Sequence, residues 1–207
     1  MIDLIAVRHG ETDWNRVRRL QGQTDVPLNA LGVEQAARLG RALAAEPIVA
    51  IHASDLLRAA TTAEPAAERL GLSIRRDPRL RERHYGVLEG RTFPEFLASH
   101  PHEAERLRVR DAHHTIEGGE SQQTFFDRVV AAVTEIAADA DRTVARGDGQ
   151  RPAILIVTHG GVLDMLHRAA TGLALDAERI APIPNAVINR LVFDDGAFVV
   201  RGWAEAP

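Results

Sequence analysis

The sequence predicts an α/β fold with a mainly parallel sheet. Short runs of aliphatic and β-branched residues alternate along the chain with longer runs whose apolar residues recur at helical spacing. The chain carries no internal repeat, low-complexity tail or Pro/Gly-rich linker. We therefore expect residues 1–207 to form a single domain, a length that supports one full-sized core.

The predicted strands are short and rich in Val, Ile and Leu. They are residues 4–7, 48–51, 153–157, 187–193 and 198–203. The run 153–157 is the clearest buried strand because it is continuously apolar. The last two strands are joined by a predicted turn at 194–196, Asp-Asp-Gly.

The predicted helices begin at polar residues and carry an apolar stripe. They are residues 31–45 with Asn29 as cap, 56–70 stopped by Gly71, 121–146, and 162–170. Residues 147–151 are expected to form a loop. The segment 91–119 is rich in charge and histidine, and we expect short helices there that lie over the sheet. The sequence leaves open whether this segment closes over a site as a lid.

Composition excludes several chemistries. The chain has no cysteine and no lysine, so all 25 basic residues are arginine. Thiol nucleophiles, a phosphate-loop lysine and a lysine Schiff base are thereby excluded, and anion binding falls to arginine, histidine and backbone N–H groups. The net charge of -4 gives no reason to expect nucleic acid or an anionic membrane as partner. The start of the sequence does not resemble a signal peptide, and we expect a cytoplasmic protein.

Two histidines occupy equivalent places, each directly after a predicted buried strand and on a glycine-containing turn. His9 precedes Gly10, and His159 precedes Gly160 and Gly161. One such histidine alone is more often a loop or capping residue. Because ligands of open α/β sheets bind beyond the carboxyl ends of the strands, both histidines would face one crevice if the two strands are neighbours. Glycine lets the backbone approach a ligand closely, and N–H groups at a helix start suit an anion.

Five motifs in a fixed order carry a resemblance. They are Arg8-His9-Gly10-Glu11-Thr12 (with Asn15 and Gln21-Gly22 behind it), Ser54-Asp55-Leu56-Leu57-Arg58-Ala59, Leu80-Arg81-Glu82-Arg83-His84-Tyr85-Gly86, Gly118-Gly119-Glu120-Ser121 and Thr158-His159-Gly160-Gly161. Together they resemble the signature of the histidine phosphatase superfamily, the phosphoglycerate mutase-like proteins. The resemblance covers residue 4 to about residue 161. It implies a three-layer α/β/α sandwich and a phosphate-transfer enzyme.

The resemblance also implies a role for each matching residue. His9 attacks phosphorus and becomes a transient phosphohistidine, and Glu82 protonates the leaving oxygen and then activates water. Three side chains surround the transferring phosphoryl group, namely Arg8, Arg58 and His159. Further phosphate or substrate contacts are expected from Asn15, Gln21, Gly22, Gly160, Arg83 and Tyr85.

Elementary chemistry agrees with these implied roles. Phosphoryl transfer needs mainly positioning and charge stabilisation, and guanidinium groups match phosphate geometry. The arginines supply what Mg²⁺ supplies elsewhere, so we expect neither a metal nor another cofactor. His100, His102, His113 and His114 lack a carboxylate at a recognised metal spacing. The cluster Arg16, Arg18 and Arg19 is either a solvated surface or a positive rim that attracts anionic substrates.

Within the resemblance, phosphatase and mutase share the same catalytic set. Three features favour a phosphatase of small phosphate monoesters: little room for an insertion between Gly90 and Gly118, the stretch 21–25, and Gly160 directly after His159. The alternative is a cofactor-dependent phosphoglycerate mutase, favoured by the Arg83–Tyr85 pair. A catalytically inactive phospholigand-binding protein is a third alternative, which the complete residue set opposes. We expect a small phosphorylated metabolite as partner; the natural substrate and a homodimer are left open.

Overall fold

The computed structural model describes residues 1–143 and 151–207. Within these residues lies one six-stranded sheet in the order β3-β2-β4-β1-β5-β6. Its strands are β1 (Ile2–Arg8), β2 (Ile48–Ala53), β3 (Ile74–Arg76), β4 (Ala153–Thr158), β5 (Ile188–Asp194) and β6 (Ala197–Glu205). The first four are parallel to one another, whereas β5 pairs antiparallel with both of its neighbours, β1 and β6. The predicted mainly parallel α/β fold is confirmed.

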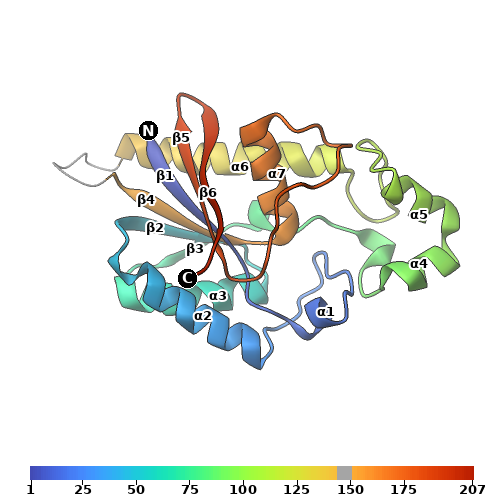
Figure 1. The fold of residues 1–207 in the computed structure, drawn as a ribbon, viewed down its shortest axis with the longest axis horizontal. Helices are drawn as coiled ribbons and strands as arrows, with labels where there is room; N and C mark the ends of the chain where they lie inside the picture. Colours follow the sequence, from blue (N-terminus) through green and yellow to red (C-terminus); the bar gives the residue numbers. More distant parts are fainter. Residues whose placement is uncertain (144–150) are drawn as a thin grey trace.

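Helices cover both faces of this sheet (Figure 1). The described α-helices are α1 (Asp13–Arg16), α2 (Ala30–Ala42), α3 (Leu57–Leu70), α4 (Phe93–Ser99), α5 (Pro101–Arg108), α6 (Gln122–Thr143) and α7 (Gly160–Thr171). Short 3₁₀ turns occupy Leu43–Ala45, Pro78–Leu80 and Gly86–Leu88. None of the helices in the described ranges is both long enough and apolar enough to cross a bilayer.

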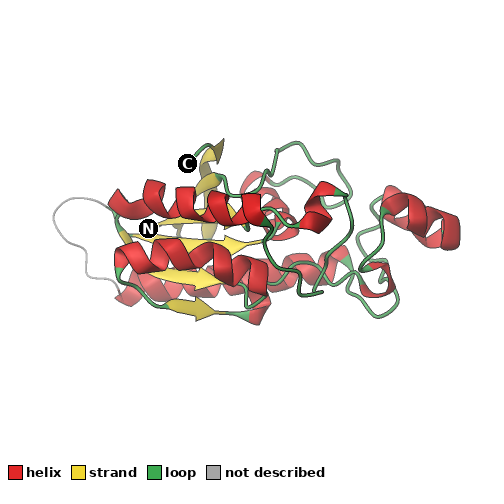
Figure 2. Cartoon of the chain, turned by 90° about the horizontal axis from the view of Figure 1, so that it is seen from below, coloured by secondary structure: helices red, strands yellow, loops and turns green. Residues whose placement is uncertain are grey.

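The alternating side chains of β1 divide the interior into two cores. Leu4 and Ala6 pack in one core with residues of α6 and α7. Ile5 and Val7 point the other way and pack in a second core with residues of α2 and α3. This period of two is what a strand buried on both faces requires. The result is the three-layer sandwich visible in Figure 2.

The segment 91–119 forms the predicted short helices, but its predicted position over the sheet is wrong. Helices α4 and α5 lie beyond the carboxyl ends of the parallel strands (Figure 1). They enclose a small core of their own, formed by buried Leu88, Phe96, Ala104 and Ile116. The sheet offers them no free apolar face there, because α6 and α7 already cover that side.

Local signals placed most helix ends correctly. The Asn29 side chain accepts a hydrogen bond from the Gly32 amide at 2.9 Å, as expected of an N-cap. Gly71 ends α3 in the left-handed region at φ 66°. The predicted end of the long helix at residue 146 and the loop 147–151 fall largely on residues 144–150, which lie outside the described residues.

Candidate active site

The two histidines identified from the sequence leave the sheet side by side. β1 and β4 are adjacent and in register, with Arg8 opposite Thr158. The His9 amide donates to the Thr158 carbonyl at 2.8 Å, and the ring centroids of His9 and His159 are 5.2 Å apart. The two strands are therefore neighbours, which is the arrangement that places both histidines in one crevice.

The His9 ring is held with one nitrogen free. Its Nδ1 lies 2.7 Å from the Gly10 carbonyl oxygen, which only accepts hydrogen bonds. Nδ1 therefore carries the proton of the neutral ring, and Nε2 carries the lone pair. Burial holds the pKa of His9 well below its usual value, and the charges of Arg58 and Arg8 lower it further. At neutral pH the ring is an uncharged potential nucleophile.

Two buried guanidinium groups flank this ring. Arg58, at the start of α3, is fully buried and donates to the carbonyls of Thr24 at 2.8 Å and Gly22 at 2.7 Å. Arg8 donates from Nη1 to the Ile183 carbonyl at 2.8 Å. Burial lowers the pKa of Arg58 to about 10, so it remains charged at neutral pH. The Nε atoms of Arg8 and Arg58 are buried and have no partner among the described residues.

His159 presents a third buried nitrogen without a partner. Its Nε2 lies 2.8 Å from the Ser54 hydroxyl oxygen, while its Nδ1 has no hydrogen-bond partner in the described part of the chain. Burial, followed by the charge of Arg58, holds the pKa of His159 well below its usual value. Unpaired buried polar atoms are costly, so these three nitrogens beside His9 indicate a site built for a polar ligand, and the two guanidinium charges favour an anion.

Glu82 joins this cluster from a loop distant in sequence. Its Oε2 accepts the Gly161 amide at 2.9 Å, in the first turn of α7, and its Oε1 accepts the Arg83 amide at 2.8 Å. The Arg128 side chain holds the loop from beneath through the carbonyls of Arg79 at 2.7 Å and Arg81 at 3.1 Å. The carboxyl group is thus fixed against the same helix start that carries His159.

A cavity of about 220 Å³ brings these groups together. Predicted residues that line it are Arg8, His9, Asn15, Gln21, Gly22, Arg58, Glu82, Tyr85 and Gly160. His159 is buried beside His9 rather than at the cavity surface, and Arg83 lines a neighbouring cavity. Of the basic cluster 16–19, Arg19 lines the cavity, whereas Arg16 pairs with Asp13 at the surface.

A family model confirms what this constellation resembles. The model described as histidine phosphatase superfamily (branch 1) matches residues 4–206. The chain belongs to the histidine phosphatase superfamily.

Individual relatives agree with this assignment. A probable phosphoglycerate mutase, GpmB, from Salmonella choleraesuis is 37% identical over 203 residues, 98% of this chain and 90% of that protein. A mycobacterial glucosyl-3-phosphoglycerate phosphatase, solved with VO₃, matches with a TM-score of 0.86 at 33% identity, covering 99% of this chain and 100% of that one. Bacillus stearothermophilus YhfR matches with a TM-score of 0.86 at 33% identity, over 99% and 98% of the two chains. This member of the superfamily is thus similar to proteins named for phosphatase activity and to proteins named for mutase activity.

Several residues of the candidate site were not identified from the sequence. Arg179 lines the cavity from the irregular segment between α7 and β5, where no motif marks it. Asn185 donates to the His9 carbonyl at 2.8 Å. The Thr62 hydroxyl, one turn along α3 from Arg58, accepts the Gly10 amide at 2.9 Å. Thr62 could have been identified because it lies four residues after Arg58 and therefore on the same face of α3. No pattern in the sequence points to Arg179 or Asn185.

A second cavity of about 500 Å³ adjoins the first and shares Leu20, Tyr85 and Arg179 with it. Its other basic residues are Arg83, Arg108 and Arg110. Three guanidinium groups meet the buried carboxylate of Asp164: Arg168 at 3.2 Å, Arg179 at 3.2 Å and Arg110 at 3.8 Å. Glu178 also lines this cavity, and Arg108 pairs with Glu105 at 2.7 Å. Positive charge still exceeds negative charge, because Arg83, Arg108, Arg110 and Arg179 line the cavity against one lining carboxylate.

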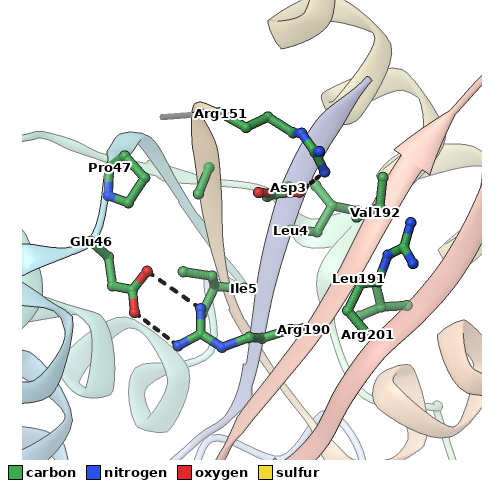
Figure 3. A pocket seen from close by; sticks show the side chains of 11 residues that line it. Asp3, Leu4, Ile5, Glu46, Pro47, Arg151, Arg190, Leu191, Val192 and Arg201 are labelled. Atoms are coloured by element: carbon green, nitrogen blue, oxygen red, sulfur yellow. Dashed lines mark hydrogen bonds and ion pairs between the residues drawn. The ribbon is translucent and has the colours of Figure 1, made fainter. Parts of the chain in front are cut away.

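A third cavity, of about 240 Å³, lies at the opposite end of the sheet (Figure 3). Its charged side chains largely satisfy one another: Arg190 pairs with Glu46 at 2.8 Å, and Arg151 pairs with Asp3 at 2.9 Å. It contains none of the predicted site residues. Across the described ranges, no cluster of three or more His, Cys, Asp or Glu side chains is arranged to hold a metal ion.

Proposed function

We propose that this protein is a phosphatase that hydrolyses small phosphate monoesters through a phosphohistidine on His9. The observation that carries the proposal is the arrangement of three buried nitrogens beside His9. They belong to Arg8, Arg58 and His159 and have no partner among residues 1–143 and 151–207, while Nδ1 of the neutral His9 is held by Gly10 and leaves Nε2 for attack. Phosphoryl transfer needs such positioned donors more than it needs further covalent chemistry.

In the first step, Nε2 of His9 attacks phosphorus. The phosphorus–nitrogen bond forms while the bond to the ester oxygen breaks, and Glu82 gives its proton to that leaving oxygen. Arg8, Arg58 and His159 donate to the phosphoryl oxygens, where negative charge gathers. Asn15 and the Gly160 amide are further donors in the proposed site.

In the second step, water attacks the phosphohistidine. Glu82, now a carboxylate, accepts a proton from that water as the new phosphorus–oxygen bond forms and the phosphorus–nitrogen bond breaks. Inorganic phosphate leaves and His9 returns to its neutral form. The bond of Glu82 to the Gly161 amide keeps its carboxyl group in place for both steps.

The second cavity supports a substrate whose alcohol part carries its own anionic group. A leaving group bonded to the phosphoryl group would extend towards Arg83, Arg110 and Arg179, where positive charge is in excess. The names of the Salmonella and mycobacterial relatives refer to phosphoglycerate and a glycosylated phosphoglycerate, which carry carboxylates. The excess of positive charge also favours the second candidate function, a cofactor-dependent phosphoglycerate mutase. In that enzyme Arg83 and Tyr85 would hold the substrate; the guanidinium carbon of Arg83 lies 5.5 Å from the centroid of the Tyr85 ring.

The deciding experiment incubates the purified protein with 3-phosphoglycerate, with and without 2,3-bisphosphoglycerate. Free phosphate and 2-phosphoglycerate are followed in the same tube, with the His9→Ala variant as control. We expect phosphate release without isomerisation, abolished in the variant. Rapid 2-phosphoglycerate formation that depends on the bisphosphate would make the protein a mutase. Absence of turnover on 3-phosphoglycerate and on a wider panel of phosphate esters would contradict the enzyme proposal.

A matched pair of substrates then tests the leaving-group pocket. Glycerol 3-phosphate differs from 3-phosphoglycerate by having a hydroxymethyl group in place of the carboxylate. We expect kcat/KM to favour the carboxylate, and Arg110→Gln to reduce that preference about tenfold, the weight of one charge-assisted hydrogen bond. Arg106→Gln is the matched control, because Arg106 lies on α5 but pairs with Asp111 outside the cavity. Equal rates for both esters would contradict the proposed pocket.

A further inference from the structure

Ser54 is buried beside the site and lies at the carboxyl end of β2. Its amide donates to the Val157 carbonyl at 3.0 Å, which ties this residue to β4 directly before the second histidine turn. The side chain is fully buried. Its hydroxyl oxygen accepts the Leu56 amide at 3.3 Å and lies 2.8 Å from Nε2 of His159.

The hydrogen atoms of this pair can be assigned by accounting for each donor and acceptor. A serine hydroxyl has one proton to donate, and a neutral imidazole has one N–H and one lone pair. If Nε2 carried the proton, Ser54 would accept from both Leu56 and His159. Its own proton would then be buried without an acceptor among the described residues, and Nδ1 of His159 would hold an unused lone pair.

The opposite assignment leaves nothing unsatisfied once an anion is bound. Ser54 accepts from Leu56 and donates to Nε2, so the proton of His159 lies on Nδ1. Nδ1 is the nitrogen that has no protein partner, and a proton there can be donated to a phosphoryl oxygen, whereas a lone pair there would repel it. Burial of the ring disfavours the doubly protonated form, so only the two neutral tautomers need to be compared.

We infer that Ser54 is a positioning residue that fixes His159 as the neutral Nδ1–H tautomer, so that Nδ1–H donates to the transferring phosphoryl group. The inference rests on the proposed function, because it assigns a phosphoryl oxygen as the acceptor. Ser54 acts through His159 and contacts no substrate.

The test is the tautomer itself, measured by long-range ¹H–¹⁵N correlation spectra of ¹⁵N-histidine-labelled protein, free and with vanadate. The His159→Gln variant assigns the His159 signals among the nine histidines. We expect Nδ1 protonated and Nε2 unprotonated in both states of the wild type. In Ser54→Ala we expect a mixture of the two tautomers, and a kcat lower by about 10- to 100-fold, less than or equal to the loss of a direct donor.

Two variants separate positioning from mere structural support. Ser54→Thr retains the hydroxyl and is expected to keep the Nδ1–H tautomer and most of kcat. Ser121→Ala removes another buried hydroxyl, one that bonds Thr124 instead, and should change neither readout. Protonated Nε2 in the wild type, or an unchanged tautomer in Ser54→Ala, would overturn the inference. Because the spectra require no turnover, failure of the phosphatase proposal would appear separately, as absence of hydrolysis by the wild type.

Discussion

Gly161 and Gly160 are adjacent in the first turn of α7, yet the structure predicts a large loss of activity for Gly161→Ala and little change for Gly160→Ala. A Cβ at Gly161 would overlap Oε1 of Glu82 and lie 3.0 Å from both Cδ of Glu82 and Cε1 of Phe125. A Cβ at Gly160 meets nothing closer than Nε of Arg8 at 3.4 Å, an ordinary contact.

The magnitude follows from which atoms must move. In Gly161→Ala the far end of a flexible carboxylate side chain gives way, so the fold is retained while the Glu82 carboxyl group withdraws by about 1 Å. A misplacement of this size costs about 100-fold in rate. Alanine is favoured over glycine within a helix by up to about 1 kcal/mol, which offsets the strain against Phe125. We therefore expect Tm to change by no more than about 4 °C.

The assay compares kcat on 3-phosphoglycerate and Tm for the wild type and both variants. We expect Gly161→Ala to lose about 100-fold in kcat while Gly160→Ala stays within a few-fold of the wild type. Single-turnover formation of phosphohistidine should slow in parallel, because Glu82 protonates the leaving oxygen in that step of the proposed mechanism. Equal activity of the two variants would refute the reasoning, since it would mean that the position of Glu82 does not limit the reaction.

Four further perturbations give measurable results. Arg58→Gln should lower kcat by about 100- to 1,000-fold, the usual effect of losing one transition-state donor, measured by steady-state hydrolysis. Vanadate should inhibit competitively and EDTA should leave activity unchanged; insensitivity to millimolar vanadate, or loss of activity on chelation, would contradict the proposed chemistry. Asp164→Asn should cost about 3–5 kcal/mol in urea unfolding, because it leaves the buried Arg168 without its carboxylate partner. The free energy of unfolding should fall as pH drops below about 6.5, by up to about 1.4 kcal/mol per pH unit for each histidine. The reason is that His9 and His159 bind protons in the unfolded chain and not in the folded protein. A double variant, His9→Gln with His159→Gln, that keeps the same dependence on pH would refute this.

The edge of the sheet that carries the candidate site could be predicted because strands β1 and β4 have a strong sequence signal. Residues 4–7 and 153–157 are continuous apolar runs, each followed after one polar residue by histidine and glycine. Strand β1 extends the first run by two residues at its start and one at its end, and β4 extends the second run by one residue at its end only. The sequence did not predict that these two strands are neighbours; the shared crevice was expected only if they are. Pairing between segments about 150 residues apart leaves no signal in the sequence of either segment. The roles of the site residues were obtained from the resemblance, and they remain predictions.

Features without a local signal were missed or misplaced. Strand β3 has only three residues, two of them exposed arginines, so it carries no apolar run to recognise. Helix α1 depends on a capping box between Thr12 and Asn15 within a single turn. Arg179 enters the site through contacts with distant segments, and the motif that contains Ser54 gave no indication of its hydrogen bond to His159. The helices α4 and α5 were identified, but periodicity does not specify which apolar surface a helix will cover.

The separate small core beneath α4 and α5 makes this enzyme modular. The groups around the phosphoryl site are anchored to β1, β2, β4 and the helices packed on the sheet, whereas Arg108 and Arg110 belong to the α4–α5 unit and its connection to α6. Leu20 and Tyr85 line both cavities and pack against this small core, so substitutions at Arg108 and Arg110 would change the leaving-group cavity with less disturbance of the proposed phosphate-transfer groups than substitutions in the core itself. A library confined to the exposed positions of residues 91–116 would therefore test new leaving groups while the proposed nucleophile and its neighbours stay unchanged, which makes this end of the molecule the natural starting point for changing its specificity.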